Sequence, residues 1–328
     1  MIEVLTTGAL NTVQDLGRDN CLRWGVGTAG AMDGLALAAG NTLLGHDAGC
    51  AGVEIQVFPF KVRFLADCDF ALTGADCDAR LDDKPLMPWA AHTTRAGQVL
   101  TLNLPRLGAL RRSRTYLCLP GGVDVPVVLN SRSTQLRGAF GGLCGRALRA
   151  GDVLRAATPT CVAGHALGLV PPEVAMPLDL EGCVAVRVLP AAEYHQYTSA
   201  SQATLWACEW KITPQSDRYG FRLAGEPLQP VAPLELRSHG IVPGVVQVPP
   251  DGQPIVQMRD AQPTGGYPKI GTVIEADLWR LGQMPIGSRI RFMETSWDEA
   301  LAALDQTHAW LAHIRRQVRL HHDARSAA

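Results

Sequence analysis

The string Arg95-Ala-Gly-Gln-Val-Leu100 is repeated almost unchanged as Arg149-Ala-Gly-Asp-Val-Leu154. A looser copy, Pro285-Ile-Gly-Ser-Arg-Ile290, follows near the end of the chain. In each string a glycine precedes a short run of β-prone residues, which is typical of a tight turn that leads into a strand. The sequence therefore predicts the same local structure three times, a glycine turn followed by a strand.

Short apolar runs surround these strings, and 33 glycines and 22 prolines separate the runs. Short β-prone runs between turn residues are typical of an all-β sandwich or barrel rather than of alternating βαβ units. The sequence therefore predicts a mainly β fold. The runs are Val62–Leu65, Phe70–Leu72, Val99–Leu104, Tyr116–Leu119, Val184–Leu189, Val245–Val248, Pro254–Met258 and Ile290–Met293.

Few helices are expected. Asp33 can cap a helix that ends near Gly45, and residues 191–206 form a second candidate. The clearest helix is C-terminal, because Ser296 and Glu299 have the spacing of a capping box. Its predicted apolar stripe consists of Leu301, Leu304, Trp310, Leu311 and Ile314.

The length of 328 residues allows two domains of ordinary size. Residues 161–183 lie in a stretch that is rich in alanine, glycine and proline and poor in charge, which favours a linker. The predicted organisation is a first β domain at 1–160, this linker at 161–183, a second β domain at 184–295, and a C-terminal helix and tail at 296–328.

A formal net charge of −1 gives no electrostatic reason to expect nucleic acid or an anionic membrane as a partner. No run of about 18 apolar residues occurs, and the first residues lack the features of a signal peptide, so the expected location is the cytoplasm. The nine cysteines form no Cys-x-x-Cys, and the histidines form no His-Glu-x-x-His. Neither a disulfide framework nor a metal site is therefore expected.

The segment Thr264-Gly265-Gly266-Tyr267-Pro268-Lys269 is the sharpest local feature of the chain. Paired glycines let backbone amides approach a ligand, Tyr267 can cover a planar group, and Lys269 can meet an anion. The alternative is a turn between strands with a surface lysine, which the spacing by itself favours. No Gly-x4-Gly-Lys-Ser/Thr string occurs, so the segment is not a phosphate-binding P-loop.

Four polar residues, Gln247, Gln253, Asp260 and Gln262, lie close together in the sequence among apolar residues. Neutral amides beside a carboxylate suit the recognition of a small amide or lactam. The alternative is an exposed strand face that alternates with the core.

Charged residues at four further positions leave two interpretations open. Arg18, Glu54, Arg218 and Arg222 can anchor a substrate, or they can belong to a structural network of arginines and carboxylates.

Two segments of the first half are also candidates. Gly121 and Gly122 before Asp124 can form a second backbone cradle or a tight turn. Ser131 stands in a hydroxyl-rich string, but the chain has no Gly-x-Ser-x-Gly elbow and no lysine within twenty residues of it. We therefore interpret the Ser131 segment as a loop that donates hydroxyls and amides.

Several longer strings together resemble one known family. They are Thr12-Val-Gln-Asp-Leu-Gly-Arg18, Gly30-Ala-Met-Asp33, Val53-Glu-Ile55, Ala71-Leu-Thr-Gly-Ala-Asp76, Tyr116-Leu-Cys-Leu-Pro-Gly-Gly-Val-Asp-Val-Pro126, Ser131-Arg-Ser-Thr134, Ser216-Asp-Arg-Tyr-Gly-Phe-Arg-Leu223, Ser238-His-Gly-Ile-Val-Pro-Gly-Val-Val-Gln-Val-Pro249, and the stretch from Asp251 through Lys269 to Asp277. The chain resembles the family of the 5-oxoprolinase C subunit, also known as the biotin-dependent carboxyltransferase or allophanate hydrolase subunit 2 family.

The resemblance implies two cyclophilin-like β-barrels and a subunit of an ATP-dependent enzyme. That enzyme opens 5-oxo-L-proline to L-glutamate together with homologues of the A and B subunits, with ATP used by the complex at an unknown site. The chain by itself is expected to be inactive. The segment 247–269 of the second barrel is expected to form the active surface, facing the first barrel near residues 121–124.

We assign roles within that surface as hypotheses. The expected catalytic residues are Lys269, Asp260 and Gln253. The expected substrate-binding residues are Gly121, Gly122, Asp124, Ser131, Arg218, Gln247, Gln262, Thr264, Gly265, Gly266 and Tyr267.

Two alternative functions remain. The first is a biotin-dependent carboxyltransferase that acts on urea or another amide with a separate carrier. None of the four lysines (Lys61, Lys84, Lys211 and Lys269) has a methionine neighbour, so no biotin is expected on this chain. The second is a regulatory partner of a kinase inhibitor that resembles the 5-oxoprolinase B subunit.

Overall fold

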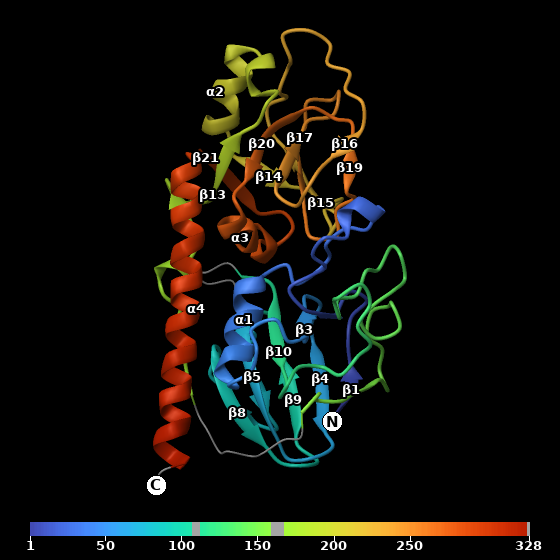
Figure 1. Cartoon of the computed structure of the whole chain (residues 1–328), viewed down its shortest axis with the longest axis vertical. Coiled ribbons are helices and arrows are strands. Elements are labelled where there is room, and N and C mark those ends of the chain that lie inside the picture. The colour runs from blue at the N-terminus through green and yellow to red at the C-terminus, as the bar shows by residue number, and fades with distance from the viewer. Residues whose placement is uncertain (107–111, 159–166, 327–328) are drawn as a thin grey trace. The chain divides into compact units, whose positions relative to one another are not determined.

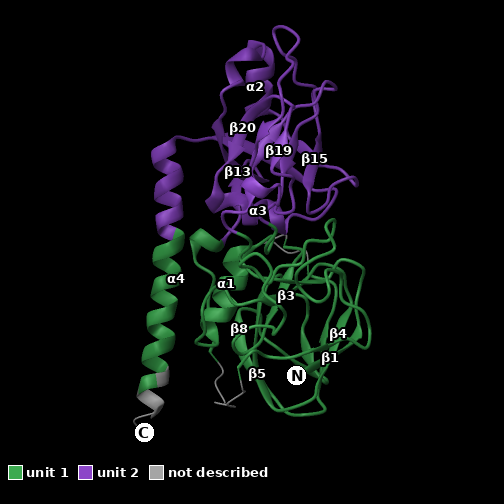
Figure 2. Ribbon diagram, turned by 45° about the vertical axis from the view of Figure 1, so that its right-hand side comes forward, with its two compact units in different colours: residues 1–18, 29–175, 307–328 green, residues 19–28, 176–306 purple. Residues whose placement is uncertain are grey.

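The computed structural model describes residues 1–106, 112–158 and 167–326. The chain forms two compact units (Figure 2). Unit 1 comprises residues 1–18, 29–175 and 307–328, and unit 2 comprises residues 19–28 and 176–306. The boundary at residue 175 falls within the predicted linker, of which residues 161–166 lie outside the described part of the chain.

Residues 19–28 belong to unit 2 although they lie within the range predicted for the first domain. They include a 3-10 turn, η1 (Leu22–Trp24). The hydroxyl of Thr28 donates to the Arg259 carbonyl at 3.2 Å, and a Cβ on Gly27 would lie 2.5 Å from the Ala261 carbonyl oxygen. These long-range contacts are what attach the segment to unit 2.

Unit 1 contains two antiparallel sheets that enclose one apolar core, to which Phe60, Phe64, Phe70, Val53 and Leu117 contribute fully buried side chains (Figure 1). The first sheet has the order β11 (Val153–Leu154), β1 (Ile2–Thr6), β4 (Phe60–Phe64), β9 (Val99–Leu102), β6 (Arg80–Leu81), β7 (Lys84–Pro85). The second has the order β2 (Thr12–Gln14), β3 (Gly52–Ile55), β10 (Thr115–Cys118), β5 (Cys68–Gly74), β8 (Ala90–Thr94).

Helix α1 (Gly34–Leu43) packs against β5 and β10 of unit 1. The Asp33 carboxylate accepts from the Ala36 N–H at 2.8 Å, which confirms the predicted cap. The close approach depends on small residues, because a Cβ on Gly40 would lie 2.7 Å from the Cys118 sulfur. A 3-10 turn, η2 (Glu173–Ala175), ends the central segment of this unit.

Unit 2 is built on a closed barrel of seven strands. The ring follows the order β13 (Cys183–Pro190), β20 (Lys269–Val273), β17 (Val245–Gln247), β18 (Ile255–Gln257), β15 (Gly220–Ala224), β14 (Trp210–Ile212), β21 (Arg289–Glu294). Parallel pairing of β13 with β21 closes it, and β12 (Leu178–Leu180) extends β13. Closure removes exposed sheet edges. The prediction of a mainly β fold with a barrel in the second half is confirmed.

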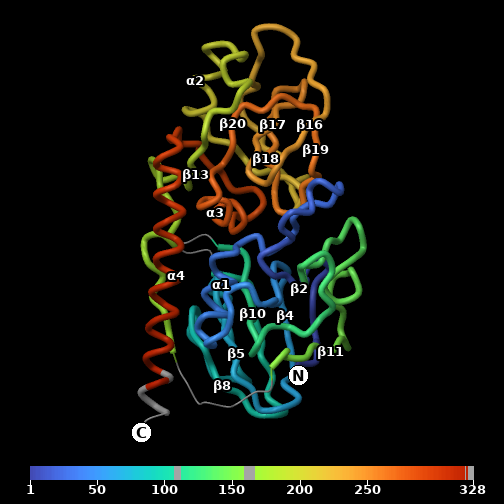
Figure 3. The backbone as a smooth tube through the Cα atoms, in the orientation of Figure 1, coloured from blue at the N-terminus to red at the C-terminus, as the bar shows by residue number. Residues whose placement is uncertain are grey.

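The remaining elements of unit 2 surround the barrel. A two-stranded ribbon pairs β16 (His239–Gly240) with β19 (Thr264–Gly265), and Figure 3 shows these strands side by side. The helices are α2 (Ser199–Ala207) and α3 (Leu278–Gln283), with the 3-10 turns η3 (Tyr194–Gln196) and η4 (Glu275–Asp277). Helix α2 begins later than the predicted start at residue 191, because Thr198 caps it by accepting from the Ser201 N–H at 3.1 Å.

The three repeated strings form the same structure in both units. Gly97, Gly151 and Gly287 have φ values of 90°, 89° and 91°, and each precedes a strand that starts two residues later. The left-handed region is accessible to glycine without steric cost. The prediction of a repeated glycine turn is therefore confirmed.

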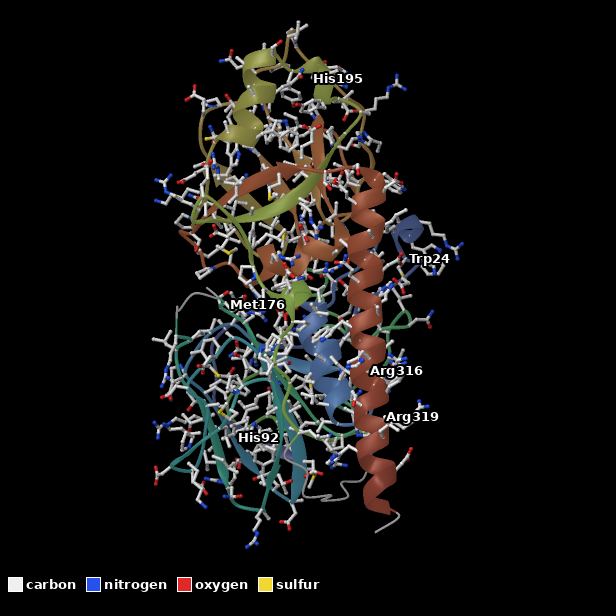
Figure 4. All side chains as sticks on the ribbon, turned by 90° about the vertical axis from the view of Figure 1, so that its left-hand side faces the viewer. Trp24, His92, Met176, His195, Arg316 and Arg319 are labelled. Carbon is white, nitrogen blue, oxygen red and sulfur yellow. The ribbon has the colours of Figure 1, made fainter. Side chains whose placement is uncertain are left out.

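Helix α4 (Trp297–Ser326) begins with the predicted capping box, because the Ser296 N–H donates to Glu299 Oε2 at 2.8 Å. Figure 4 shows Arg316 and Arg319 on this helix. The predicted apolar stripe is partly wrong, since Leu301 is 47% exposed. Ile314 is buried as predicted, Leu304, Trp310 and Leu311 are half-buried, and Ala303 and Val318 are also buried.

Candidate functional site

A polar face lies on adjacent strands of the unit 2 barrel. Gln247 on β17 is opposite Lys269 on β20 and opposite Ile255 on β18, so these side chains share one face. Their neighbours Val246 and Val256 are fully buried and point the other way, into the barrel core. The sheet therefore brings Gln247 and Lys269, two of the residues predicted for the site, onto one face.

Lys269 contacts two polar residues from other segments. Its Nζ atom contacts Nε2 of His239 on β16 and lies 3.8 Å from Oε2 of Glu193, just before η3. The backbone N–H of Lys269 also donates to Glu193 Oε2 at 3.1 Å. Lys269 is therefore held at its backbone and at its side-chain end.

Gln247 belongs to a chain of amides. Gln257 Nε2 donates to Gln247 Oε1 at 3.1 Å, and Gln247 Nε2 donates to the Tyr267 carbonyl at 3.2 Å. Both glutamines are buried. A buried amide that is bonded at both its oxygen and its nitrogen has a fixed orientation, so these contacts determine which way Gln247 presents its oxygen and its nitrogen.

The paired glycines beside Lys269 lie in close packing. A Cβ on Gly265 would lie 2.7 Å from Gln247 Nε2, and one on Gly266 would lie 3.1 Å from the Leu236 carbonyl oxygen. Tyr267, which follows them, is 47% exposed. The segment thus combines a turn between strands with an accessible aromatic ring next to the lysine.

Asp260 and Arg218 form a buried ion pair. Arg218 Nε donates to Asp260 Oδ2 at 3.0 Å and Nη2 donates to Oδ1 at 2.9 Å, and each side chain is 5% exposed. The Asp260 N–H also donates to the Arg218 carbonyl at 2.8 Å. This bidentate geometry favours the structural interpretation of Arg218 over that of a substrate anchor.

The other predicted residues of unit 2 differ in burial and in hydrogen bonding. Gln253 uses both ends of its amide on one residue, since Oε1 accepts from the Gly225 N–H at 3.0 Å and Nε2 donates to the Gly225 carbonyl at 3.2 Å. Gln262 and Thr264 are exposed. We interpret Gln253 as a brace for the loop at Gly225.

Gly121, Gly122, Asp124 and Ser131 lie in unit 1, whereas the other predicted site residues lie in unit 2. Gly121 and Gly122 have φ values of 69° and 85°, and the Gly122 N–H donates to the Leu119 carbonyl at 2.8 Å. This is the geometry of a tight turn, and it occupies the Gly122 amide. The Asp124 side chain is exposed.

Substitution of Gly122 by alanine is expected to destabilise unit 1 by about 1–3 kcal/mol. Its φ of 85° disfavours any Cβ, and that Cβ would lie 2.8 Å from the Ala51 backbone nitrogen. Gly97→Ala is the control, because Gly97 has a similar φ but no atom within 4 Å of its Cβ position. Urea unfolding monitored by tryptophan fluorescence should rank Gly122→Ala as clearly the more damaging change; equal midpoints would contradict the packing argument.

Ser131 is bound to a buried carboxylate. Its hydroxyl donates to Asp15 Oδ1 at 2.7 Å, and the Ser133 hydroxyl donates to the same oxygen. Ser131 Oγ also accepts from the Ser133 N–H at 2.9 Å. The contacts fit the predicted loop of hydroxyls and amides, here folded around Asp15.

Glu54 is fully buried in unit 1. Its Oε2 atom accepts from the Tyr116 hydroxyl and from the Met32 N–H, both at 2.7 Å, and the Tyr116 oxygen accepts from the Asp33 N–H at 2.8 Å. Burial raises the pKa of Tyr116 well above its ordinary value, and the Glu54 charge adds to the increase. These bonds favour the structural interpretation of Glu54.

Arg18 and Arg222 differ in burial. Arg18 is 1% exposed, and its guanidinium lies 4.7 Å from the centre of the Phe140 ring. Its Nε atom donates to the Val128 carbonyl at 3.3 Å. Arg222 is exposed. The contacts of Arg18 thus serve the packing of unit 1.

Three residues that bond to Lys269 or to its neighbour Gln247 were not predicted from the sequence, namely Glu193, His239 and Gln257. His239 stands in one of the strings that carry the family resemblance, and that string was the available signal. Glu193 precedes Lys269 by 76 residues and has no local pattern around it. Only the pairing of β13 with β20 brings its segment to the lysine.

Within the described ranges, no three His, Cys, Asp or Glu side chains gather as a metal site. None of the helices in the described part of the chain is sufficiently long and apolar to cross a membrane.

Comparison with known proteins identifies the family. Residues 24–294 match the family model for the carboxyltransferase domain, subdomain A and B. The chain is 43% identical over 303 residues to the 5-oxoprolinase C subunit of Escherichia coli (strain K12), an alignment that covers 92% of this chain and 94% of that protein. It is 42% identical over 318 residues to the 5-oxoprolinase C subunit of Haemophilus influenzae, with 97% of this chain and 99% of that protein covered.

A solved structure of the K. lactis urea amidolyase is also similar, with a TM-score of 0.86 at 26% identity. The similarity covers 95% of this chain and 20% of that much longer chain. The fold, the family model and two relatives of nearly equal length agree. The chain belongs to the carboxyltransferase-domain family, subdomains A and B, and is related both to the C subunit of 5-oxoprolinase and to urea amidolyase.

Proposed function

We propose that this chain is a subunit of an ATP-dependent 5-oxoprolinase, acting with partners that resemble the A and B subunits of that enzyme. The observation that carries the proposal is that the chain is 43% and 42% identical to two 5-oxoprolinase C subunits. Each alignment covers more than 90% of this chain and more than 90% of the C subunit. The reaction would open 5-oxo-L-proline to L-glutamate.

The polar face of unit 2 suits part of that chemistry. A lactam carbonyl is a poor electrophile, so its oxygen must be activated, and phosphorylation by ATP would supply that activation. Oriented amides and a cation are the groups that recognise a small molecule with an amide and a carboxylate. Gln247, Gln257 and Lys269 provide them on adjacent strands.

A carboxyltransferase acting on urea is the second candidate, supported by the structural similarity to the K. lactis urea amidolyase. That similarity has 26% identity and covers 20% of the larger protein, whereas the 5-oxoprolinase C subunit of E. coli matches at 43% over 94% of its length. We therefore rank the oxoprolinase function first.

The assembly requirement can be tested directly. The purified chain is expected to hydrolyse no ATP in response to 5-oxoproline, whereas addition of the A and B subunits should produce 5-oxoproline-dependent phosphate release. Omitting each chain in turn provides the controls. Full turnover by the single chain, or undiminished turnover by the mixture that lacks it, would refute the proposed role.

A further inference from the structure

Lys269 is contacted by polar groups from two separate segments of unit 2 and is paired with a polar residue on a third. Glu193 comes from the turn after β13, His239 from β16, and Gln247 from the neighbouring strand β17. These segments are distant in the sequence and all are placed by barrel or ribbon pairing. A surface lysine at a turn does not require such support, which points to a specific task for this ammonium group.

The contacts of His239 determine where its ring carries a proton. Its Nδ1 atom lies 2.8 Å from the Arg237 carbonyl oxygen, which can only accept a hydrogen bond. Nδ1 must therefore carry a hydrogen. In the neutral imidazole, Nε2 then has a free lone pair, and this is the atom that contacts the Lys269 ammonium.

Glu193 places a carboxylate beside the Lys269 ammonium. Its carboxylate is 12% exposed at the side chain and lies 3.8 Å from Lys269 Nζ, which is an ion-pair distance longer than a hydrogen bond. The Lys269 ammonium donates one N–H to His239 Nε2 and retains further N–H groups for a ligand, because lysine has three.

We infer that Glu193 and His239 are positioning residues that hold the Lys269 ammonium in place as a hydrogen-bond donor to an anionic group of a small carboxylate-bearing substrate. The expected effect on turnover rests on the proposed function. The assignment of the His239 tautomer and of its contact with Lys269 is independent of that function.

The tautomer is testable on the full chain without any partner. Long-range ¹H–¹⁵N NMR spectra of histidine-labelled protein at pH 8 should show His239 as the neutral form with the proton on Nδ1, and His239→Gln should identify its signals by their loss. In Lys269→Met the Nε2 resonance should shift towards that of an unbonded lone pair. A proton on Nε2, or no response to Lys269→Met, would overturn the assignment.

Activity variants then separate positioning from packing. His239→Gln keeps an acceptor near Lys269 and should retain most of the activity of the reconstituted complex, whereas His239→Leu removes it and should raise KM for 5-oxoproline about tenfold or more. His195→Leu is the histidine control, because His195 is exposed on η3 and is seen at the surface in Figure 4. Glu193→Gln should also raise KM, because it keeps an acceptor for the Lys269 N–H but removes the charge.

Equal activity of His239→Gln and His239→Leu, with both chains folded, would refute the positioning role. If the wild-type complex shows no response to 5-oxoproline, the proposed function is refuted. The NMR measurement then still decides the His239 tautomer, because it needs no substrate. An effect on kcat with KM unchanged would also contradict the inference, because a substrate anchor acts on ground-state binding.

Discussion

Replacement of Asp260 by alanine is expected to destabilise unit 2 by about 3–5 kcal/mol, because it leaves the buried Arg218 guanidinium without its bidentate partner. Both side chains are 5% exposed, so water cannot readily compensate the charge. Urea unfolding of the purified chain measures the loss. The double variant Arg218→Met with Asp260→Leu should recover much of it, because a buried apolar pair needs no compensation.

Glu226→Ala provides the matched control for this prediction. Glu226 is an exposed carboxylate of the same unit, and its removal should change stability by less than about 0.5 kcal/mol. If Asp260→Ala were as stable as Glu226→Ala yet inactive in the complex, Asp260 would serve catalysis as the sequence suggested rather than the fold.

Lys269→Met is expected to lower kcat/KM for 5-oxoproline about 100-fold, chiefly through a higher KM, while the chain remains folded, because the charged donor that anchors the substrate is lost. Methionine preserves the length and the apolar stem of the side chain. Gln253→Ala should behave in the opposite way, with lower stability but normal activity for each folded complex, since its amide braces Gly225.

Paired measurements of thermal midpoint and turnover distinguish the two variants. Wild-type turnover by folded Lys269→Met would place the active surface elsewhere. Loss of turnover by stable Gln253→Ala would restore Gln253 as a catalytic candidate.

Each of the eight predicted apolar runs overlaps a strand, because apolar runs between glycine and proline carry the signal locally. The helix caps at Asp33 and Ser296 were predictable for the same reason, since each cap bonds a residue three positions away. The prediction for Leu301 was wrong because a helical stripe shows which side chains share a face, but it does not show where the covering surface ends. The attachment of residues 19–28 to unit 2 depends on contacts such as Thr28 with Arg259, which no local pattern encodes.

The candidate site was only partly predictable. Lys269, Gln247 and the glycines between them were identified because they lie within one segment that is unusual in composition. Glu193 and His239 reach Lys269 from 76 and 30 residues away, through strand pairings that the sequence does not specify. Arg218 and Asp260 were each candidates, but their mutual pairing, which favours a structural role, required the structure.

The most direct test of the proposed function measures the products of the reconstituted complex supplied with 5-oxo-L-proline and ATP. If this chain is a 5-oxoprolinase subunit, L-glutamate and phosphate should appear in equal amounts, both should depend on this chain, and urea should not replace 5-oxoproline. Consumption of ATP with urea and a biotin carrier, without response to 5-oxoproline, would contradict that function and support the carboxyltransferase function instead.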